Sequence, residues 1–507
     1  MRFKNFKNLF VLDLANNHFG DYNHAKKIID VFSKIILINK IYATIKFQFR
    51  DLDTYIHPDD KYLNNNKYIT RFKSTRFSTK NFKDLFFLIK KKGILTSCTP
   101  FDEKSVSLIE DLNFDIIKIA SVSSNDFSIL ERVSKNKIPK IISTGGLDLT
   151  EIDKIVSFMQ HKGQNFSLMH CISIYPTKDN DFHLQFIKNL KARYRDVEIG
   201  WSTHEDPSNF LPSTLAYAYG ASIFERHIGI NNKKYKLNNY SSTPEVYQKW
   251  LDNFKKIKQI SGNYIKTITN EEKNSLSLLS RGVYANKNLK KNSEINLKDI
   301  SFLFPAQKRQ ILSSNFTDGI ILKKNIRINE PIFFNDVSFK KKDKTFLLKQ
   351  SIHKVKALLN YANIKLGTDF DMEISHHYGM NKFKKFGAFL FNIVNKKYCK
   401  KIIVLLPKQK HPKQFHKIKE ETFTIVYGRL YCIIDNKKYL LSIGDNIHIK
   451  PGIWHEFWSD RQGCVFEEIS TTSLTNDSFY FDPVINKKTV NERKTSVTNW
   501  GRWELKA

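Results

Sequence analysis

Polar side chains with catalytic potential recur through the first half of the chain, each at or just after a short apolar segment. They comprise lysines, hydroxyl residues, histidines and other polar residues: Asp13, Asn16, Asn17, His18, Lys46, Gln48, Thr99, Lys118, Ser121, Ser143, Thr144, His170, Ser173, Tyr175, His204 and His227. Burying so many polar groups is costly unless they pair with one another or with a ligand. Lysines and hydroxyls suit a phosphate group, and two imidazoles suit a divalent metal ion with open positions. The pattern predicts one site built from several strand ends.

The elements that position these residues alternate between strand and helix. The expected strands are Leu9–Asn16, Thr44–Phe49, Ile94–Thr99, Ile116–Ser121, Lys140–Thr144, Ser167–Ser173, Glu198–Ser202 and Ser222–His227. Helical patterns are clearest at Asp21–Lys34, Phe82–Lys92, Lys104–Leu112 and Leu149–His161. Eight strand-then-helix units predict an α/β fold, the (β/α)₈ TIM barrel, whose active site lies at the carboxyl ends of the strands. Periodicity alone leaves an open doubly wound sheet as the alternative.

A chain of 507 residues is too long for one ordinary core, and its patterns predict three domains. The barrel is expected over residues 1–262. A polar linker at 263–280 precedes a compact module of short strands at 281–338. A basic second linker with a helix, 339–369, leads to a last domain at 370–500, where evenly spaced Gly and Asn turns predict a small antiparallel β-barrel.

Composition narrows the class of protein. Residues of the hydrophobic types make up 41% of the chain, yet no apolar run reaches the ~18 residues of a membrane span. Asp13 interrupts the N-terminal apolar run, so we expect no signal peptide. The five cysteines are scattered, which favours reduced thiols in a cytoplasmic protein. The net charge of +33 is spread along the chain without a basic arm, so we expect no nucleic-acid partner, although the charge would attract an anionic substrate.

Eight sequence pieces in the predicted barrel carry a family resemblance. In order they are LDLANNHFGD, IKFQ, TPFD, IKIAS, ISTGG, MHCISIYPT, IGWSTH and FERHIG. Together they resemble the sialic acid synthase family, which includes the N-acetylneuraminate, legionaminate and pseudaminate synthases. Residues 281–338 resemble the antifreeze-like (SAF) domain of that family, and 370–500 resemble a cupin. The resemblance implies a transferase that condenses phosphoenolpyruvate with an N-acylated hexosamine-type aldehyde and releases phosphate. It also implies a homodimer in which each SAF domain covers the partner's barrel.

The resemblance also implies roles for individual residues. Lys46 and Lys118 match phosphoenolpyruvate-binding lysines, and His204 and His227 match two ligands of a divalent metal such as Mn²⁺ or Mg²⁺. Matching hydroxyl donors to phosphoenolpyruvate are Thr99, Ser121, Ser143 and Ser202. A lone serine of this kind more often caps a turn. Tyr175 and Asp13 match further catalytic positions, although the family usually has Glu where Asp13 stands. Apart from the resemblance, Glu225 lies two residues before His227 on the same strand face, so its carboxylate could support that metal ligand.

Three departures concern the sugar half of the expected site. Leu237 replaces an Asp of the family, Ser123 replaces a Glu, and Phe304 replaces the Arg that precedes a proline in the SAF domain. An apolar ring cannot replace a guanidinium donor. An unusual acceptor sugar or weak catalysis would follow. A non-catalytic sugar-phosphate-binding or regulatory protein is a second hypothesis, and a cupin-based sugar isomerase or epimerase with an accessory barrel is a third.

The cupin-like segment has its own candidate site. Gln414, His416 and Glu421 stand where cupins place His, His and Glu, and His455 supplies a later ligand. Imidazole and carboxylate ligands suit Mn, Fe or Ni, so a second divalent metal could bind here. The alternative is a cupin that only binds sugar or only supports dimerisation.

Overall fold

The computed structural model describes residues 3–61, 66–263, 266–317, 319–339, 344–367, 372–474 and 476–497. Internal contacts divide the chain into two compact units, Met1–Thr267 and Ile268–Ala507. The described helices include none that is both long and apolar enough to cross a membrane.

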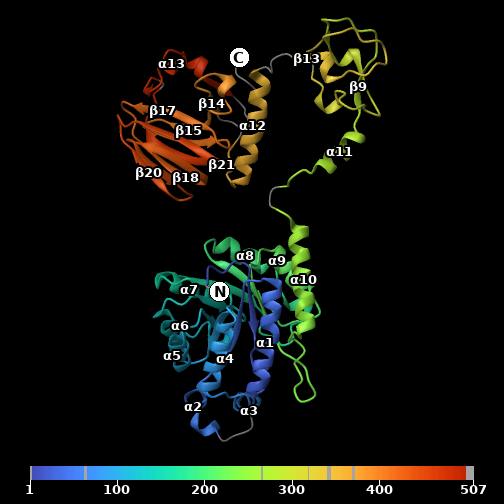
Figure 1. The fold of residues 1–507 in the computed structure, drawn as a ribbon. Helices are drawn as coiled ribbons and strands as arrows, with labels where there is room; N and C mark the ends of the chain where they lie inside the picture. The colour runs from blue at the N-terminus through green and yellow to red at the C-terminus, as the bar shows by residue number, and fades with distance from the viewer. Residues whose placement is uncertain are drawn as a thin grey trace. The chain divides into compact units, whose positions relative to one another are not determined.

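Eight parallel strands close into a barrel in the first unit (Figure 1). They are β1 (Leu9–Asp13), β2 (Ala43–Phe49), β3 (Leu95–Pro100), β4 (Ile116–Ile119), β5 (Lys140–Ser143), β6 (Phe166–Cys171), β7 (Glu198–Ser202) and β8 (Ile223–His227). β1 pairs with both β2 and β8, which closes the ring. The predicted TIM barrel is therefore confirmed, and the open-sheet alternative is wrong.

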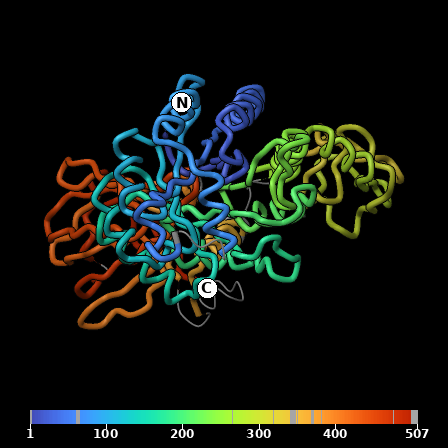
Figure 2. The backbone as a smooth tube through the Cα atoms, turned by 90° about the horizontal axis from the view of Figure 1, so that it is seen from below, coloured from blue at the N-terminus to red at the C-terminus, as the bar shows by residue number. Residues whose placement is uncertain are grey.

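Helices surround the barrel, as the two views of the backbone show (Figures 1 and 2). Their bounds are α1 (Tyr22–Asn39), α2 (Leu52–Tyr55), α3 (Lys67–Ser74), α4 (Thr79–Lys91), α5 (Glu103–Leu112), α6 (Phe127–Ser134), α7 (Leu149–His161), α8 (Phe186–Arg193), α9 (Leu211–Ala218) and α10 (Pro244–Ser261). Several start at an aspartate whose side chain accepts an N–H bond, as Asp148 does from Glu151. The longer helices pack an apolar stripe into the core outside the strands, such as Ile28, Phe32 and Ile36 of α1.

The inside of the barrel is divided into an apolar end and a polar end. A cluster of buried apolar side chains fills its amino-terminal end: Phe6, Leu9, Val11, Leu95, Ile116, Ile141, Met169 and Ile223. Because alternate residues of a strand share a face, Leu9, Val11 and Asp13 of β1 all point inward, and Asp13 is the last of them. The apolar end is closed to water, so the polar side chains can meet a ligand only at the carboxyl end.

The second unit begins with short elements. These are α11 (Asn270–Leu278), β9 (Gly282–Ala285), β10 (Glu294–Ile295), β11 (Ile300–Leu303), β12 (Ile320–Leu322) and β13 (Val337–Phe339). β10, β12 and β13 form one small sheet, and β9 pairs with β11 in another. A core that includes Val283, Ile295, Ile311 and Leu322 lies between them. The stretch from 282 to 339 thus has its own hydrophobic core.

The rest of the second unit is a ten-stranded antiparallel sheet preceded by helix α12 (Lys344–Tyr361). Its strands are β14 (Met372–Ser375), β15 (Ala388–Asn395), β16 (Tyr398–Leu405), β17 (Lys410–His416), β18 (Glu421–Ile434), β19 (Lys437–Leu441), β20 (Asn446–Ile449), β21 (His455–Thr471), β22 (Ser478–Tyr480) and β23 (Lys494–Val497). The short helices α13 (Pro483–Asn486) and α14 (Val490–Arg493) precede β23. Leu348, Ile352 and Val355 of α12 join the core of this sheet. The predicted boundaries at residues 370 and 500 lie outside the described residues.

Candidate functional site

A network of buried charges occupies the carboxyl end of the barrel. Nζ of Lys46 on β2 lies 2.6 Å from Oε1 of Glu225 on β8 and 3.0 Å from Oδ2 of Asp13 on β1. Nζ of Lys118 on β4 lies 3.6 Å from the other oxygen of Glu225 and donates a hydrogen bond to Oγ of Ser143 on β5. All five residues are buried. Glu225 therefore joins two ammonium groups, one of which also pairs with Asp13, and these four charged groups come from four strands.

The network keeps Lys46 and Glu225 charged. Burial lowers the pKa of Lys46, but the charges of Asp13 and Glu225 outweigh it and raise the pKa above its usual value. Burial raises the pKa of Glu225, but Lys118 and Lys46 lower it further, so the net shift is downward. Burial is the main reason that the pKa of Lys118 falls below its usual value, and Glu225 offsets part of this effect. Lys118 has the weaker compensation, so an anionic ligand would stabilise its charged form most.

Hydroxyl groups surround the same end of the barrel. Oγ of Ser121 accepts a hydrogen bond from the Gly145 amide at 3.2 Å, and a Cβ added to Gly145 would lie 2.7 Å from that oxygen. A side chain at position 145 would therefore crowd this hydroxyl. Thr99 is buried, and its Oγ1 has no hydrogen-bond partner among the described residues. Ser202 is also buried, and pairs in register with Cys171 and Glu225 on the neighbouring strands. Three strands and the β4 exit therefore carry hydroxyls at the carboxyl end of the barrel, and that of Ser143 contacts Lys118.

Two imidazoles lie beside this network. His204, after β7, and His227, at the end of β8, have ring centres 5.4 Å apart. Nδ1 of His204 is 3.0 Å from the Ile172 carbonyl, which leaves its Nε2 as the acceptor. Burial, with a smaller effect from His227, lowers the pKa of His204 to about 3, and burial lowers that of His227. Both rings are therefore neutral at physiological pH, the form that binds metals.

The free nitrogens fit a divalent ion. Nδ1 of His227 is buried without a hydrogen-bond partner in the described part of the chain, although an orphaned polar atom of this kind is rare. Nε2 of His227 lies 3.6 Å from Oδ2 of Asp13. Two neutral imidazoles beside a carboxylate suit a metal with open positions. The residues fit the predicted metal, with Asp13 rather than Glu225 next to the ring.

Two tyrosine rings lie next to the imidazoles. The ring centre of Tyr175 is 4.2 Å from that of His204, and Tyr240 lies 5.2 Å from His227. Tyr175 remains 52% exposed, so it can contact a ligand that enters from solvent. The surrounding protein partly desolvates the Tyr175 hydroxyl and raises its pKa, so the side chain is a neutral hydrogen-bonding group. Sequence reasoning singled out Tyr175 but gave Tyr240 no role.

The three departures lie in different surroundings. Ser123 is buried in the turn after β4, and Leu237 lies against Gly229, where a Cβ would meet Leu237 Cδ2 at 2.4 Å. Phe304 is 62% exposed on the 282–339 stretch. None of these side chains supplies a charge to the barrel.

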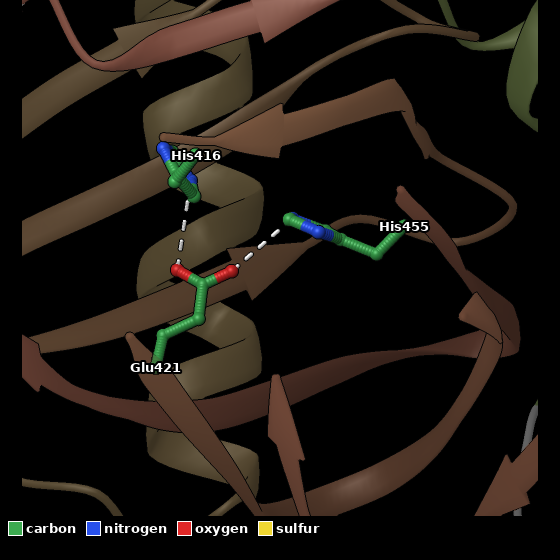
Figure 3. A group of neighbouring side chains, drawn as sticks. All are labelled: His416, Glu421 and His455. Carbon is green, nitrogen blue, oxygen red and sulfur yellow. Dashed lines mark ion pairs between the residues drawn. The ribbon is translucent and has the colours of Figure 1, made fainter. Parts of the chain in front are cut away.

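A second candidate site lies inside the ten-stranded sheet. Nε2 of His416 lies 3.6 Å from Oε2 of Glu421, and Nε2 of His455 lies 3.1 Å from Oε1. Figure 3 shows both rings turned toward the carboxylate from separate strands. Nδ1 of His416 contacts the Asp477 carbonyl at 2.7 Å, and Nδ1 of His455 contacts that of Ile453 at 3.1 Å. These carbonyls orient each Nε2 as an acceptor. The described residues contain one such group of three close ligand atoms, and it could hold a metal ion.

Two neighbours weaken that site for a cation. The side-chain nitrogen position of Gln414 lies 3.3 Å from Nε2 of His455 and 3.4 Å from Nε2 of His416. Lys419 forms a buried ion pair with Glu421 and another, at 2.9 Å, with Glu468. Burial lowers the pKa of Lys419, but the charges of Glu468 and Glu421 outweigh it and raise the pKa. The Lys419 ammonium group, which is paired with Glu421, would repel a metal ion bound to the same carboxylate. The amide oxygen of Gln414 is also a poorer metal ligand than imidazole.

The Gln414→His variant is expected to bind Zn²⁺ or Ni²⁺ about tenfold or more tightly than the parent, because imidazole replaces the amide. His455→Ala should remove this binding. Both substitutions are made in a His204→Ala/His227→Ala background, so that bound metal is assigned to the second unit. Metal titration with elemental analysis measures the effect. His448→Ala is the matched control, because His448 is exposed and paired with Glu420 at 2.7 Å. Equal metal binding in all of these variants would contradict the site.

Sequence reasoning missed the main partner of Glu225 and the role of Lys419. Glu225 was predicted to support His227, and the structure also places its carboxylate between Lys46 and Lys118. Lys419 stands in the run His-Lys-Ile-Lys-Glu-Glu, which reads as an exposed charged turn. The available signal for Lys419 was its position two residues before Glu421, but that spacing alone does not bury a lysine.

The closed barrel, with buried lysines, hydroxyls and paired imidazoles at its carboxyl end, defines a (β/α)₈ barrel protein whose candidate site lies where this fold binds its ligands. A NeuB family model matches residues 40–266, and a cupin domain model matches residues 401–466. The chain belongs to the NeuB family. The predicted resemblance to sialic-acid-type synthases and to a cupin is therefore confirmed.

Individual proteins are similar to this chain over most of their own length. The chain is 30% identical to an uncharacterised protein of Methanocaldococcus jannaschii, over 57% of this chain and 83% of that one. It is 25% identical to the N,N'-diacetyllegionaminic acid synthase of Campylobacter jejuni, over 64% of this chain and 99% of that one. A crystal structure of a Chromobacterium violaceum protein assigned to spore coat polysaccharide biosynthesis is 36% identical, with a TM-score of 0.63, and covers 66% of this chain and 100% of its own.

Proposed function

We propose that the barrel condenses phosphoenolpyruvate with an N-acylated hexosamine-type aldehyde and releases phosphate, giving a nonulosonic acid. The observation that carries this proposal is the pair of buried lysines, Lys46 and Lys118, held by Glu225 beside the imidazoles of His204 and His227. C3 of phosphoenolpyruvate forms the new bond to the aldehyde carbon. Water adds at C2, and the bond from C2 to the phosphate oxygen breaks.

Each group has a part in this reaction. Lys46 and Lys118, with the hydroxyls of Thr99, Ser121, Ser143 and Ser202, bind the phosphate and carboxylate of phosphoenolpyruvate. Asp13 lies within 3.6 Å of His227 and orients water or accepts its proton. Tyr175 contacts the acceptor from the open side. A divalent metal held by His204 and His227 would polarise the aldehyde oxygen.

The departures argue that the acceptor is not simple N-acetylmannosamine, or that this sugar is used poorly. Phe304 cannot donate a charge-assisted hydrogen bond to an acylamino group. Losing such a bond costs about 1.5–3 kcal/mol, or roughly tenfold or more in specificity. Efficient synthesis of ordinary N-acetylneuraminate by the purified protein would contradict this expectation.

The test of the proposed function is phosphate release. Phosphoenolpyruvate is supplied with Mn²⁺ and a panel of 2-acylamino hexoses, and products are identified by mass. With one acceptor we expect phosphoenolpyruvate to release phosphate and to give a nonulosonic acid whose mass equals phosphoenolpyruvate plus acceptor plus one water, less one phosphoric acid. Two controls separate turnover from background hydrolysis. One reaction contains no acceptor, and the other contains the Lys118→Met variant; neither should release phosphate above background. Binding of phosphoenolpyruvate without any turnover would favour the non-catalytic alternative.

We also propose that the protein is a homodimer in which the 281–338 module, as an SAF domain, covers the partner's barrel. The support is the family resemblance and the separate hydrophobic core of this stretch. Light scattering at micromolar concentration is expected to give the mass of two chains. An active monomer would contradict this arrangement.

The cupin is proposed as an auxiliary sugar-binding or isomerising module. Its site residues are His416, Glu421 and His455, with Gln414 beside them. The His455→Ala variant should lose the cupin site but keep its phosphoenolpyruvate turnover largely unchanged.

A further inference from the structure

One arginine at the mouth of the barrel is enclosed without a counter-charge. The guanidinium carbon of Arg50, the residue after β2, lies 3.5 Å from the ring centre of Phe101 and 4.2 Å from that of Phe72. Its two terminal nitrogens lie 3.5 and 3.4 Å from Oε1 of Gln48, at the long limit of hydrogen bonding. Its Nε is buried and has no hydrogen-bond partner in the described part of the chain.

Two other arginines of the same unit each pair with a carboxylate. Arg226 is buried and pairs with Glu205 at 2.8 Å, and Arg132 pairs with Glu110 at 2.6 Å. Arg50 has no carboxylate within 4.0 Å among the residues that the structure describes. Burial is the largest influence on the pKa of Arg50 and lowers it to about 10, although Tyr55, by its charge and a side-chain hydrogen bond, and Asp13 offset part of that shift; the group is still charged at neutral pH. A guanidinium enclosed by aromatic rings without a carboxylate is an incomplete ion pair, because desolvation of its charge is only partly compensated.

Arg50 lies on the side of the site where Asp13 approaches His227. Gln48, which contacts Arg50, donates from Nε2 to Oδ2 of Asp13 at 3.3 Å. The same oxygen lies 3.6 Å from Nε2 of His227. Arg50 is therefore one amide side chain away from Asp13. Lys118 and Ser143, by contrast, lie on β4 and β5. Arg71 of α3 adds positive charge, since its field lowers the pKa of both Arg50 and His227 after the larger effect of burial.

We propose that Arg50 is a specificity-determining residue that binds an oxyanion, a phosphate or a carboxylate, on the acceptor sugar. This rests on the proposed function. The anionic groups of phosphoenolpyruvate are served by Lys46, Lys118 and their hydroxyls, whereas Arg50 lies toward the imidazoles that would hold the aldehyde. The acceptor's far end would extend from Asp13 past Gln48 to the guanidinium. The planar fork of arginine matches the geometry of both oxyanions, and flanking rings hold it in place.

The experiment compares matched acceptors on the full-length protein. N-acetylmannosamine, its 6-phosphate and the corresponding C6 uronic acid are tested as ligands by calorimetry, and as substrates with phosphoenolpyruvate and Mn²⁺. We expect the wild type to bind at least one anionic acceptor more tightly than the neutral sugar. Arg50→Met should weaken binding of that acceptor by roughly tenfold to a hundredfold and leave the neutral sugar within about twofold. Arg50→Lys should retain part of the preference, because charge remains but the fork is lost.

The control is Arg76→Met, which removes an arginine from the same segment. Arg76 is exposed and paired with Asp53 at 2.6 Å, so its loss should leave the preference unchanged. Thermal melting checks that each variant is folded. An equal loss of neutral and anionic ligands in Arg50→Met, or no preference in the wild type, would overturn the proposal. Calorimetry gives this answer even if no acceptor turns over, whereas turnover of a neutral acceptor without any effect of Arg50→Met would retain the synthase and reject only the role of Arg50. A phosphate-only or carboxylate-only preference identifies which oxyanion is bound.

Discussion

Alanine at His204 or His227 is expected to reduce turnover by about a thousandfold or more, since a metal that polarises the aldehyde supplies several kcal/mol of transition-state stabilisation. The two ring centres lie 5.4 Å apart, and Nδ1 of His227 is buried without a partner in the described residues. Removing either ring leaves a single imidazole, which cannot retain a divalent ion against water. The measurement is phosphate release with added Mn²⁺, together with elemental analysis of the purified variants.

A matched control separates metal loss from damage to the fold. His161 is an exposed histidine on α7 that contacts Ser157, and His161→Ala should retain both activity and metal. Treatment of the wild type with EDTA should abolish activity, and Mn²⁺ should restore it. Full activity in EDTA, or normal turnover by either variant, would show that the two histidines do not hold a required metal.

Replacing Glu225 by alanine is expected to destabilise the free protein by about 3–5 kcal/mol, the range for breaking a buried ion pair by removing one partner. Lys118 would lose its carboxylate, and Lys46 would retain only Asp13, at 3.0 Å. Phosphoenolpyruvate should restore part of the stability because its negative charges occupy the same region. Urea unfolding with and without phosphoenolpyruvate measures both effects, and we expect the ligand to stabilise the variant more than the wild type.

The control for this prediction is Glu198→Ala. Glu198 begins β7, pairs with the exposed Lys7 at 3.5 Å and accepts a hydrogen bond from Ser222 at 2.7 Å, so its loss should cost only about 1–2 kcal/mol, clearly less than the loss of Glu225. If Glu225→Ala does not fold, Glu225→Gln keeps the shape and removes the charge. A variant as stable as the wild type, with no added benefit from phosphoenolpyruvate, would show that Glu225 is not the counter-charge of the two lysines.

The barrel strands were predictable because their pattern is local. Leu9–Asp13 and Ile223–His227 are short apolar runs that end in polar residues, and amphipathic helices follow most such runs. Alternation along a strand also indicated that Glu225 and His227 share a face. The carboxyl ends of parallel strands meet at one end of a closed barrel, so lysines, hydroxyls and histidines at those ends were predicted to share a site.

Local patterns could not show which charges meet. Lys46, Lys118 and Glu225 lie far apart in the chain, and any of several carboxylates could have been their partner. Arg50 and Lys419 carried still less signal, because the chain has 83 lysines and arginines and most such residues are solvated. Burial between Phe72 and Phe101, or between Glu421 and Glu468, depends on packing of distant segments.

The sequence by itself determined the order of strands and helices, the polar ends of the barrel strands and the residue types available for chemistry. These follow from periodicity and from side-chain properties, which are local. Only the tertiary structure decided that Glu225 joins two lysines, that Asp13 lies next to His227, and that Arg50 is enclosed without a carboxylate. Such pairings depend on distances of a few ångströms between residues remote in sequence, and electrostatic energies change steeply over that range.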